Sequence, residues 1–193
     1  MALTASTMLD LGTKAPDFQL QDVKSGETIS PDTFADKKAL LVMFICSHCP
    51  FVKHVQDELA KLGNDYLPKG VGIVAISSNS VQTHPQDGPE HLKTQAETVG
   101  FSFPYCYDET QDVAKAYTAA CTPDFFLFDG DRKLAYRGQL DDSRPGNDKP
   151  VTGAHLRAAL DKVLAGESIS EDQKPSVGCN IKWHPGSEPS YFG

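Results

Sequence analysis

Two cysteines three residues apart, Cys46 and Cys49, are the side chains whose types and spacing point most directly to chemistry. They follow the apolar run 39–45, which is typical of a buried strand, and they precede a segment with apolar residues at helical spacing. We expect Cys46 at the N-terminus of that helix, where unpaired amides and the peptide dipoles favour thiolate over thiol. Its pKa should then be lowered, so that Cys46 is the nucleophile and the more buried Cys49 closes a disulfide. Sulfurs that point apart, or that are sealed in the apolar interior, would contradict this hypothesis.

Two other interpretations of the cysteine pair compete with redox chemistry. The cysteines could be buried side chains without a chemical role. A zinc site would need four nitrogen or sulfur ligands, and the sequence has neither a second CxxC nor an HxxxH pattern. Extra ligands would have to come from His48, His54, Cys121 or Cys179. The strand-to-helix context favours redox chemistry, and we expect neither a metal nor a cofactor.

His48 stands directly before the second cysteine. A histidine at this position is expected to donate a hydrogen bond to the thiolate of Cys46 or to carry positive charge beside it. Either effect stabilises the reduced form and makes the disulfide a stronger oxidant. The alternative is an exposed loop histidine with little effect on the pair.

Composition limits the class of protein and its partners. The chain has 193 residues, of which 26 are acidic and 18 basic, so its formal net charge is −8. This balance argues against nucleic acid as a partner, because phosphate binding needs clustered Lys and Arg. The longest apolar run, 39–46, is too short to span a bilayer, and the first residues lack the pattern of a secretory signal. We therefore expect a cytoplasmic protein that does not associate with a membrane.

The order of predicted elements indicates one α/β domain over residues 1–165, followed by an extended tail over residues 166–193 that packs on it. The strands that we expect are 39–45 and 71–77, a hairpin of 125–128 with 134–137, and shorter extended segments within 11–20 and 26–35. The expected helices run from near Cys46 to near Gly63 and over 90–99, 110–120 and 152–164, with Thr152 as a cap. A mixed central sheet flanked by helices follows from this order.

Several stretches resemble one group of proteins within the thioredoxin fold. They are GTKAPDFQL, FICSHCPFVKH, SNSVQTHPQDGPE, FPYCYDETQDVAKAYTAACTPDFFLFD, LAYRGQLDDSRPGN and SVGCNIKWHPGSEP. Together they extend from about Gly12 to Pro189. They resemble a peroxiredoxin-like branch of the alkyl hydroperoxide reductase and thiol-specific antioxidant (redoxin) group, here with a CxxC motif. The resemblance implies a thioredoxin-like fold and thiol chemistry.

Two positions depart from the peroxiredoxin pattern. The peroxidatic cysteine of that pattern matches Cys49, and the Thr or Ser expected three residues earlier is replaced by Cys46. The arginine that stabilises the attacking thiolate is replaced by Thr122-Pro123. Ordinary peroxide reduction is therefore disfavoured.

The Thr122-Pro123 pair resembles the arrangement in thioredoxins, in which the proline is cis and faces the cysteines. The resemblance implies that the Thr122 backbone is free to pair with a substrate peptide. An ordinary trans proline at a strand start is the alternative.

Cys179 lies in the tail near the only tryptophan, Trp183. If Trp183 packs on the domain, Cys179 could lie near Cys46 as a third redox thiol. A buried thiol that only holds the tail in place is the interpretation that we favour.

These observations lead to three hypotheses about function. The first is a thiol–disulfide oxidoreductase that cycles Cys46 and Cys49, acting on a disulfide-containing protein or a small thiol with a thiol electron donor. The second is a peroxiredoxin-like antioxidant that reduces peroxide. The third is a non-catalytic protein that binds a metal or senses redox state. A cytoplasmic location favours a reductant, whereas His48 favours an oxidant.

Overall fold

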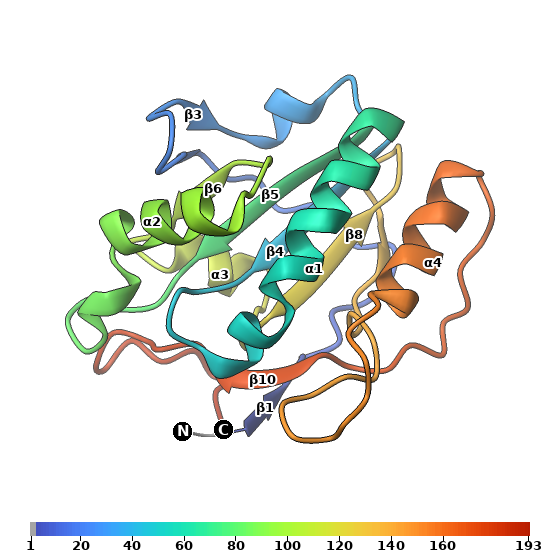
Figure 1. Cartoon of the computed structure of the whole chain (residues 1–193). Helices are drawn as coiled ribbons and strands as arrows, with labels where there is room; N and C mark the ends of the chain where they lie inside the picture. Colours follow the sequence, from blue (N-terminus) through green and yellow to red (C-terminus); the bar gives the residue numbers. More distant parts are fainter. Residues whose placement is uncertain (1–2) are drawn as a thin grey trace.

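The computed structural model describes residues 3–193 and is built around a five-stranded sheet in the order β6-β5-β4-β8-β9 (Figure 1). β4 (Ala39–Phe44) pairs in parallel with β5 (Val71–Ser77), and β5 pairs in parallel with β6 (Tyr105–Tyr107). β8 (Asp124–Phe128) is antiparallel to both β4 and β9 (Leu134–Tyr136). The predicted mixed sheet of a thioredoxin-like fold is confirmed.

Helices cover both faces of this sheet. α1 (Pro50–Tyr66), α2 (Pro89–Val99) and α4 (Ala154–Leu164) pack on one face, where Leu41 and Met43 of β4 point. α3 (Asp112–Ala116) and the short helix η1 (Pro31–Phe34) pack on the other, where Leu40 and Val42 point. The alternation of β4 residues between two cores explains why every residue of that strand is apolar. Two further single-turn helices are η2 (Leu67–Lys69) and η3 (Pro85–Asp87).

Two small sheets tie peripheral segments to this core. β10 (Val177–Asn180), in the tail, lies between β1 (Leu3–Ala5) and β7 (Cys121–Thr122), antiparallel to both. β2 (Leu20–Gln21) pairs with β3 (Thr28–Ile29). In Figure 1, β10 crosses below the start of α1. The tail therefore reaches the end of the sheet at which the cysteine pair is placed.

Most predicted elements are present, and their boundaries differ for local reasons. The prediction that a helix starts near Cys46 is wrong, because α1 begins at Pro50 and has Cys49 as its N-cap. α3 is shorter than predicted because the residues that flank it, Gln111 and Thr118, have φ values of 66° and 50°, outside the helical region. The N-cap of α4 is Gly153 rather than Thr152.

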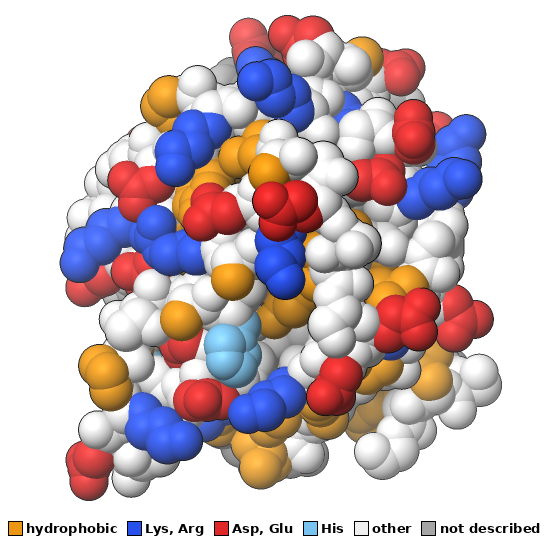
Figure 2. All heavy atoms as spheres, turned by 90° about the vertical axis from the view of Figure 1, so that its right-hand side faces the viewer, with side chains coloured by type: hydrophobic (Ala, Val, Ile, Leu, Met, Phe, Trp, Pro, Cys, Tyr) orange, Lys and Arg blue, Asp and Glu red, His pale blue; other side chains and the backbone are white. Residues whose placement is uncertain are grey.

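The surface in Figure 2 carries acidic and basic side chains interspersed over the face beside α4. A clustered basic patch, which phosphate binding requires, does not lie on this face. Within residues 3–193, no helix has the length and apolar character that crossing a bilayer demands.

The packing of η1 on β5 gives a first prediction. A Cβ added at Gly72 would lie 2.7 Å from Cδ1 of the buried Phe34 ring. Gly72→Ala should therefore lower the free energy of unfolding by about 1–3 kcal/mol, a typical cost of overpacking a core. Urea unfolding measures this change, with Gly193→Ala as a control because a Cβ there meets nothing within 4 Å. An unchanged midpoint for Gly72→Ala would contradict the packing.

Candidate active site

The cysteine pair lies in the connection between β4 and α1. The chain leaves β4 at Phe44, and Cys46 follows in an irregular turn before the helix begins at Pro50. Pro50 fits the first helical position because the amide that it lacks would have no partner within the helix. Cys49 is thus the residue whose side chain faces the free amides of the first turn.

Cys49 is the cysteine of the pair whose pKa is lowered. A hydrogen bond from the Cys46 thiol has the largest effect on Cys49, and it is joined by hydrogen bonds from Cys179, from the Thr122 hydroxyl and from the backbone N–H of Val52. Together they outweigh burial and lower the pKa of Cys49 to about 4. The expectation that Cys46 has the lowered pKa is wrong, since α1 begins at Pro50 and has Cys49, rather than Cys46, at its N-terminus.

Cys46 holds the proton of the pair. Its hydrogen bond to Cys49 is the main cause that raises its pKa well above the ordinary value, followed by burial and by the nearby Asp87 carboxylate. The Thr122 Oγ1 atom lies 3.5 Å from Cys46 Sγ. The two cysteines therefore form a thiol–thiolate pair beside a hydroxyl group.

Asp87, in the loop after β5, organises the turn between the two cysteines. Its Oδ1 accepts hydrogen bonds from the backbone amides of Ser47 (2.9 Å) and His48 (3.2 Å). Its Oδ2 accepts from Nδ1 of His48 and from Nδ2 of Asn79. Burial would raise the pKa of Asp87, but these hydrogen bonds outweigh it and the pKa lies below its ordinary value. A carboxylate is therefore fixed beside Cys46.

His48 is oriented by Asp87 rather than by the cysteines. Its Nδ1 atom is hydrogen-bonded to Asp87 and lies 3.9 Å from Cys46 Sγ. The His84 ring stacks on it at 5.1 Å between centroids. The structure thus places His48 near Cys46, as predicted, but its main partner is a carboxylate that the sequence did not single out.

Thr122-Pro123 faces the pair, and its peptide bond is cis. The resemblance implied that the Thr122 backbone is free to pair with a substrate, and this is wrong. Thr122 is paired with Cys179 in the β7–β10 ladder. The tail therefore occupies the edge of β7 that faces the cysteines.

Cys179 contacts the second cysteine of the pair. Its Sγ atom lies 2.7 Å from Cys49 Sγ, rather than beside Cys46 as one hypothesis supposed. Burial is the main cause that raises the pKa of Cys179 to about 12, and the contact with Cys49 adds to it. Trp183 is buried in the core on the α3 face, as expected if the tail packs on the domain.

All three sulfurs lie beneath the surface. Cys46 and Cys49 have no exposed area, and Cys179 is 1% exposed. The two thiols are hydrogen-bonded to one another, but both are covered, contrary to the expectation that they are accessible, so a substrate reaches them only when a covering segment moves. Thr122 of β7 and Cys179 of β10 contact the sulfurs of the pair, and Asp87 lies beside Cys46.

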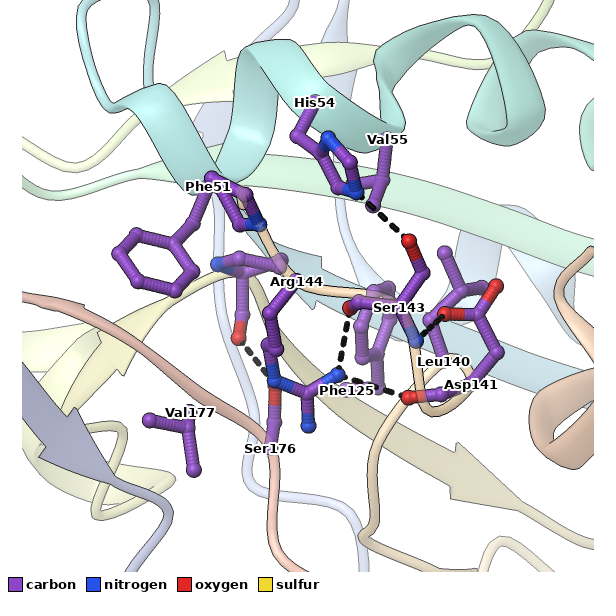
Figure 3. Close-up of a pocket in the computed structure, with 12 residues that line it drawn as sticks. Phe51, His54, Val55, Phe125, Leu140, Asp141, Ser143, Arg144, Ser176 and Val177 are labelled. Atoms are coloured by element: carbon purple, nitrogen blue, oxygen red, sulfur yellow. Dashed lines mark hydrogen bonds between the residues drawn. The ribbon is translucent and has the colours of Figure 1, made fainter. Parts of the chain in front are cut away.

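A small pocket borders the site on the side of Pro123 (Figure 3). It has a volume of about 20 Å³, and Phe51, Pro123 and Phe125 give it an apolar floor. Ser176 and Val177 of the tail form one wall, so the pocket would widen if the tail moved away.

Three donor atoms near the pair could hold a metal ion. They are Cys46 Sγ, a ring nitrogen of His48 and a carboxylate oxygen of Asp87, all within 4.8 Å of one another. The other ligands considered from the sequence do not join this group: His54 is hydrogen-bonded to Ser143. Cys121 Sγ points toward the Pro123 carbonyl, and Cys179 contacts Cys49.

Sequence reasoning missed Asp87, Asn79 and Gln95, whose Nε2 atom donates to the carbonyl of Cys46. A signal for Asp87 and Asn79 was present, because the loop after β5 and the turn after β4 follow adjacent parallel strands. The carboxyl ends of such strands meet at one edge of a sheet, where sites commonly form. Polar residues in the loop 79–87 were therefore candidates for the site.

The mixed sheet, the cysteine pair at a helix N-terminus and the facing Thr-Pro pair define a protein of the thioredoxin-like class. The chain belongs to the AhpC/TSA family, which matches residues 11–137. Comparison with curated proteins finds no match.

Solved structures support the fold. An uncharacterized conserved protein from Geobacillus kaustophilus is 56% identical, with a TM-score of 0.94, over 97% of this chain and 99% of that one. The hypothetical protein SMc02350 from Sinorhizobium meliloti 1021 is 50% identical, with a TM-score of 0.93, over 95% of this chain and 100% of that one. The thioredoxin domain of thiol-disulfide oxidoreductase BVU-2223 from Bacteroides vulgatus is 23% identical, with a TM-score of 0.57, over 67% of this chain and 88% of that one.

The charge distribution in the pair gives a second prediction. Reduced protein should keep one thiolate at neutral pH and lose it as the pH falls through about 4, because a thiol with a depressed pKa is charged above that value. Cys49→Ser should abolish this signal, whereas Cys46→Ser should keep it because the serine hydroxyl still donates to Cys49. Ultraviolet thiolate absorbance during an acid titration measures both. A thiolate signal that survives in Cys49→Ser and vanishes in Cys46→Ser would show that Cys46, rather than Cys49, has the lowered pKa.

Proposed function

We propose that this protein is a thiol–disulfide oxidoreductase that cycles Cys46 and Cys49 between dithiol and disulfide. The observation that carries the proposal is the placement of two thiols, Cys46 and Cys49, at the start of α1, both within hydrogen-bond distance of Thr122. Thiol–disulfide exchange needs a thiolate to attack and a second thiol to resolve. Both groups are in contact with one another.

Cys49 is the nucleophile in this scheme. Its thiolate attacks one sulfur of a substrate disulfide, so that a mixed disulfide forms and the other substrate sulfur leaves with the proton of Cys46. The Cys46 thiolate then attacks Cys49 Sγ and releases the second substrate sulfur as a thiolate. The substrate disulfide has gained two electrons, and the Cys46–Cys49 pair has lost them. A thiol electron donor restores the dithiol.

Peroxide reduction is a second candidate, favoured by the position of the thiolate. Cys49, which the resemblance matches to the peroxidatic cysteine, holds the negative charge. Attack on a peroxide would give a Cys49 sulfenic acid, and Cys46 would condense with it to a disulfide and water. In the described chain, the groups that act on the two thiols include no arginine, which leaves disulfide exchange as the favoured reaction.

Metal binding has the donor cluster of Cys46, His48 and Asp87 in its favour. Both oxygens of Asp87 already accept hydrogen bonds that hold the turn together. A metal ion would have to replace those bonds, and structural zinc sites use four ligands rather than three. Redox chemistry needs no such rearrangement.

One set of variants tests these functions. With insulin as the protein disulfide and dithiothreitol as the donor, the wild type should accelerate reduction, and both Cys46→Ser and Cys49→Ser should lose at least about tenfold of that rate. The Cys46→Ser/Cys179→Ser double variant should also accumulate a mixed disulfide through Cys49, because neither thiol in contact with Cys49 is left to resolve it. A wild type no faster than dithiothreitol alone, with no trapped adduct, would overturn the proposal.

The same samples separate the alternatives. Rapid hydrogen peroxide consumption without insulin reduction would favour the peroxidase. A stoichiometric metal ion in freshly purified wild type, absent from Cys46→Ser, would favour metal binding.

A further inference from the structure

Cys49 is the middle member of a row of three sulfurs. It is the hydrogen-bond partner of Cys46 on one side and lies 2.7 Å from Cys179 Sγ on the other. A disulfide needs an S–S distance of about 2.05 Å, so little movement separates Cys49 and Cys179 from a bond. Cys49 therefore has two thiols within reach, one from the CxxC motif and one from the tail.

The tail strand is fitted closely to the site. Cys179 pairs with Thr122 in the β7–β10 ladder, and a Cβ added to its neighbour Gly178 would lie 2.0 Å from the Thr122 carbonyl oxygen. Only glycine permits so close an approach of the two backbones. The Ser176 hydroxyl donates to the carbonyl of Pro123 at 2.6 Å. β10 thus lies on β7 as an added strand does, with a cysteine directly over the thiolate.

We propose that Cys179 is a third redox thiol, held by β10 as an internal disulfide partner of Cys49, and that β10 must leave β7 before a protein substrate can enter. This inference rests on the proposed function, because the oxidation that reaches Cys179 is the one that the Cys46–Cys49 pair receives from its substrate.

The transfer to Cys179 is an exchange without net oxidation. Cys179 loses its proton and attacks Cys49 Sγ in the oxidised pair. The Cys49–Cys179 bond forms, the Cys46–Cys49 bond breaks, and Cys46 leaves as a thiolate that takes up a proton. One disulfide replaces another, and the electron count of the protein does not change.

Oxidation of the pair makes the surroundings of Cys179 more favourable for this step. In the reduced protein, burial and then the negative charge of Cys49 keep Cys179 protonated. Once Cys49 is in a disulfide, its charge is gone, while the backbone N–H of Phe51 and the charge of Lys182 still favour the Cys179 thiolate. Oxidation of the pair therefore removes the effect of Cys49 that raises the pKa of Cys179, while the effect of burial remains.

The position of β10 also points to the class of substrate. Ser176 and Val177 line the small pocket in which Phe51, Pro123 and Phe125 lie beside polar side chains that include His54, Ser143 and Arg144. A segment that replaces β10 would pair with Thr122 and lie over this pocket, as an extended polypeptide does. A protein disulfide fits this site better than a small one.

Disulfide mapping tests the role of Cys179. The reduced Cys46→Ser variant is oxidised with diamide, blocked with iodoacetamide and digested without reduction, and its peptides are identified by mass spectrometry. We expect a Cys49–Cys179 link in most molecules and none in the Cys46→Ser/Cys179→Ser control. Cys49 and Cys179 both alkylated in Cys46→Ser, or Cys49 linked to Cys106 or Cys121, would overturn the proposal.

A second variant tests whether β10 covers the site. Gly178→Ala should force β10 away from Thr122 and raise both the alkylation rate of the reduced pair and the rate of insulin reduction, by threefold or more. Gly193→Ala makes the same change where a Cβ meets nothing within 4 Å, and its rates should equal those of the wild type. Unchanged rates in Gly178→Ala, with the fold retained by circular dichroism, would show that β10 does not limit access.

The two proposals can fail separately. A Cys49–Cys179 link in a protein that reduces no insulin would refute the proposed function but keep the third thiol. Insulin reduction by the wild type, with no Cys49–Cys179 link in Cys46→Ser, would support the proposed function and refute the role of Cys179 as a third redox thiol.

Discussion

The free amides at the start of α1 are the constraint on which the site depends. Cys49 is the N-cap of α1 and Cys179 lies 2.7 Å from it, so two sulfurs lie at the first turn of one helix. Peptide dipoles and unpaired N–H groups make this turn a place where negative charge is stable. The mixed sheet, the cis proline and the tail bring thiols to this turn, which is why segments far apart in the sequence meet there.

The arrangement also bears on whether the protein is a reductant or an oxidant. A histidine beside a cysteine pair favours the thiolate and hence an oxidising disulfide. Here the Asp87 carboxylate weakens that effect, because it accepts a hydrogen bond from Nδ1 of His48 and raises the pKa of Cys46. The carboxylate opposes the histidine. The charge that remains on the pair comes from the helix amides and from hydrogen bonds among the thiols.

The fold was largely predictable, and the errors have specific physical causes. The strand 71–77 was predicted to the residue, and 39–45 to within one, because buried parallel strands are continuous apolar runs. The start of α1 was misplaced because the spacing of apolar residues does not mark the residue that caps a helix. Pro50 is the first residue of α1, a position that proline fits well. That error of a few residues moved the expected thiolate from Cys49 to Cys46.

The sequence by itself determined the fold class, the pair of thiols and the residues that face them, since these follow from local spacing and apolar periodicity. It did not determine which sulfur carries the charge, which group orients His48 or what covers Thr122. Those outcomes depend on contacts between segments distant in the chain: Asp87 with the turn at 47–48, and Cys179 with both Cys49 and Thr122. Electrostatic effects on a thiol act over a few ångströms of space, and only the tertiary structure decides which charges and donors come that close.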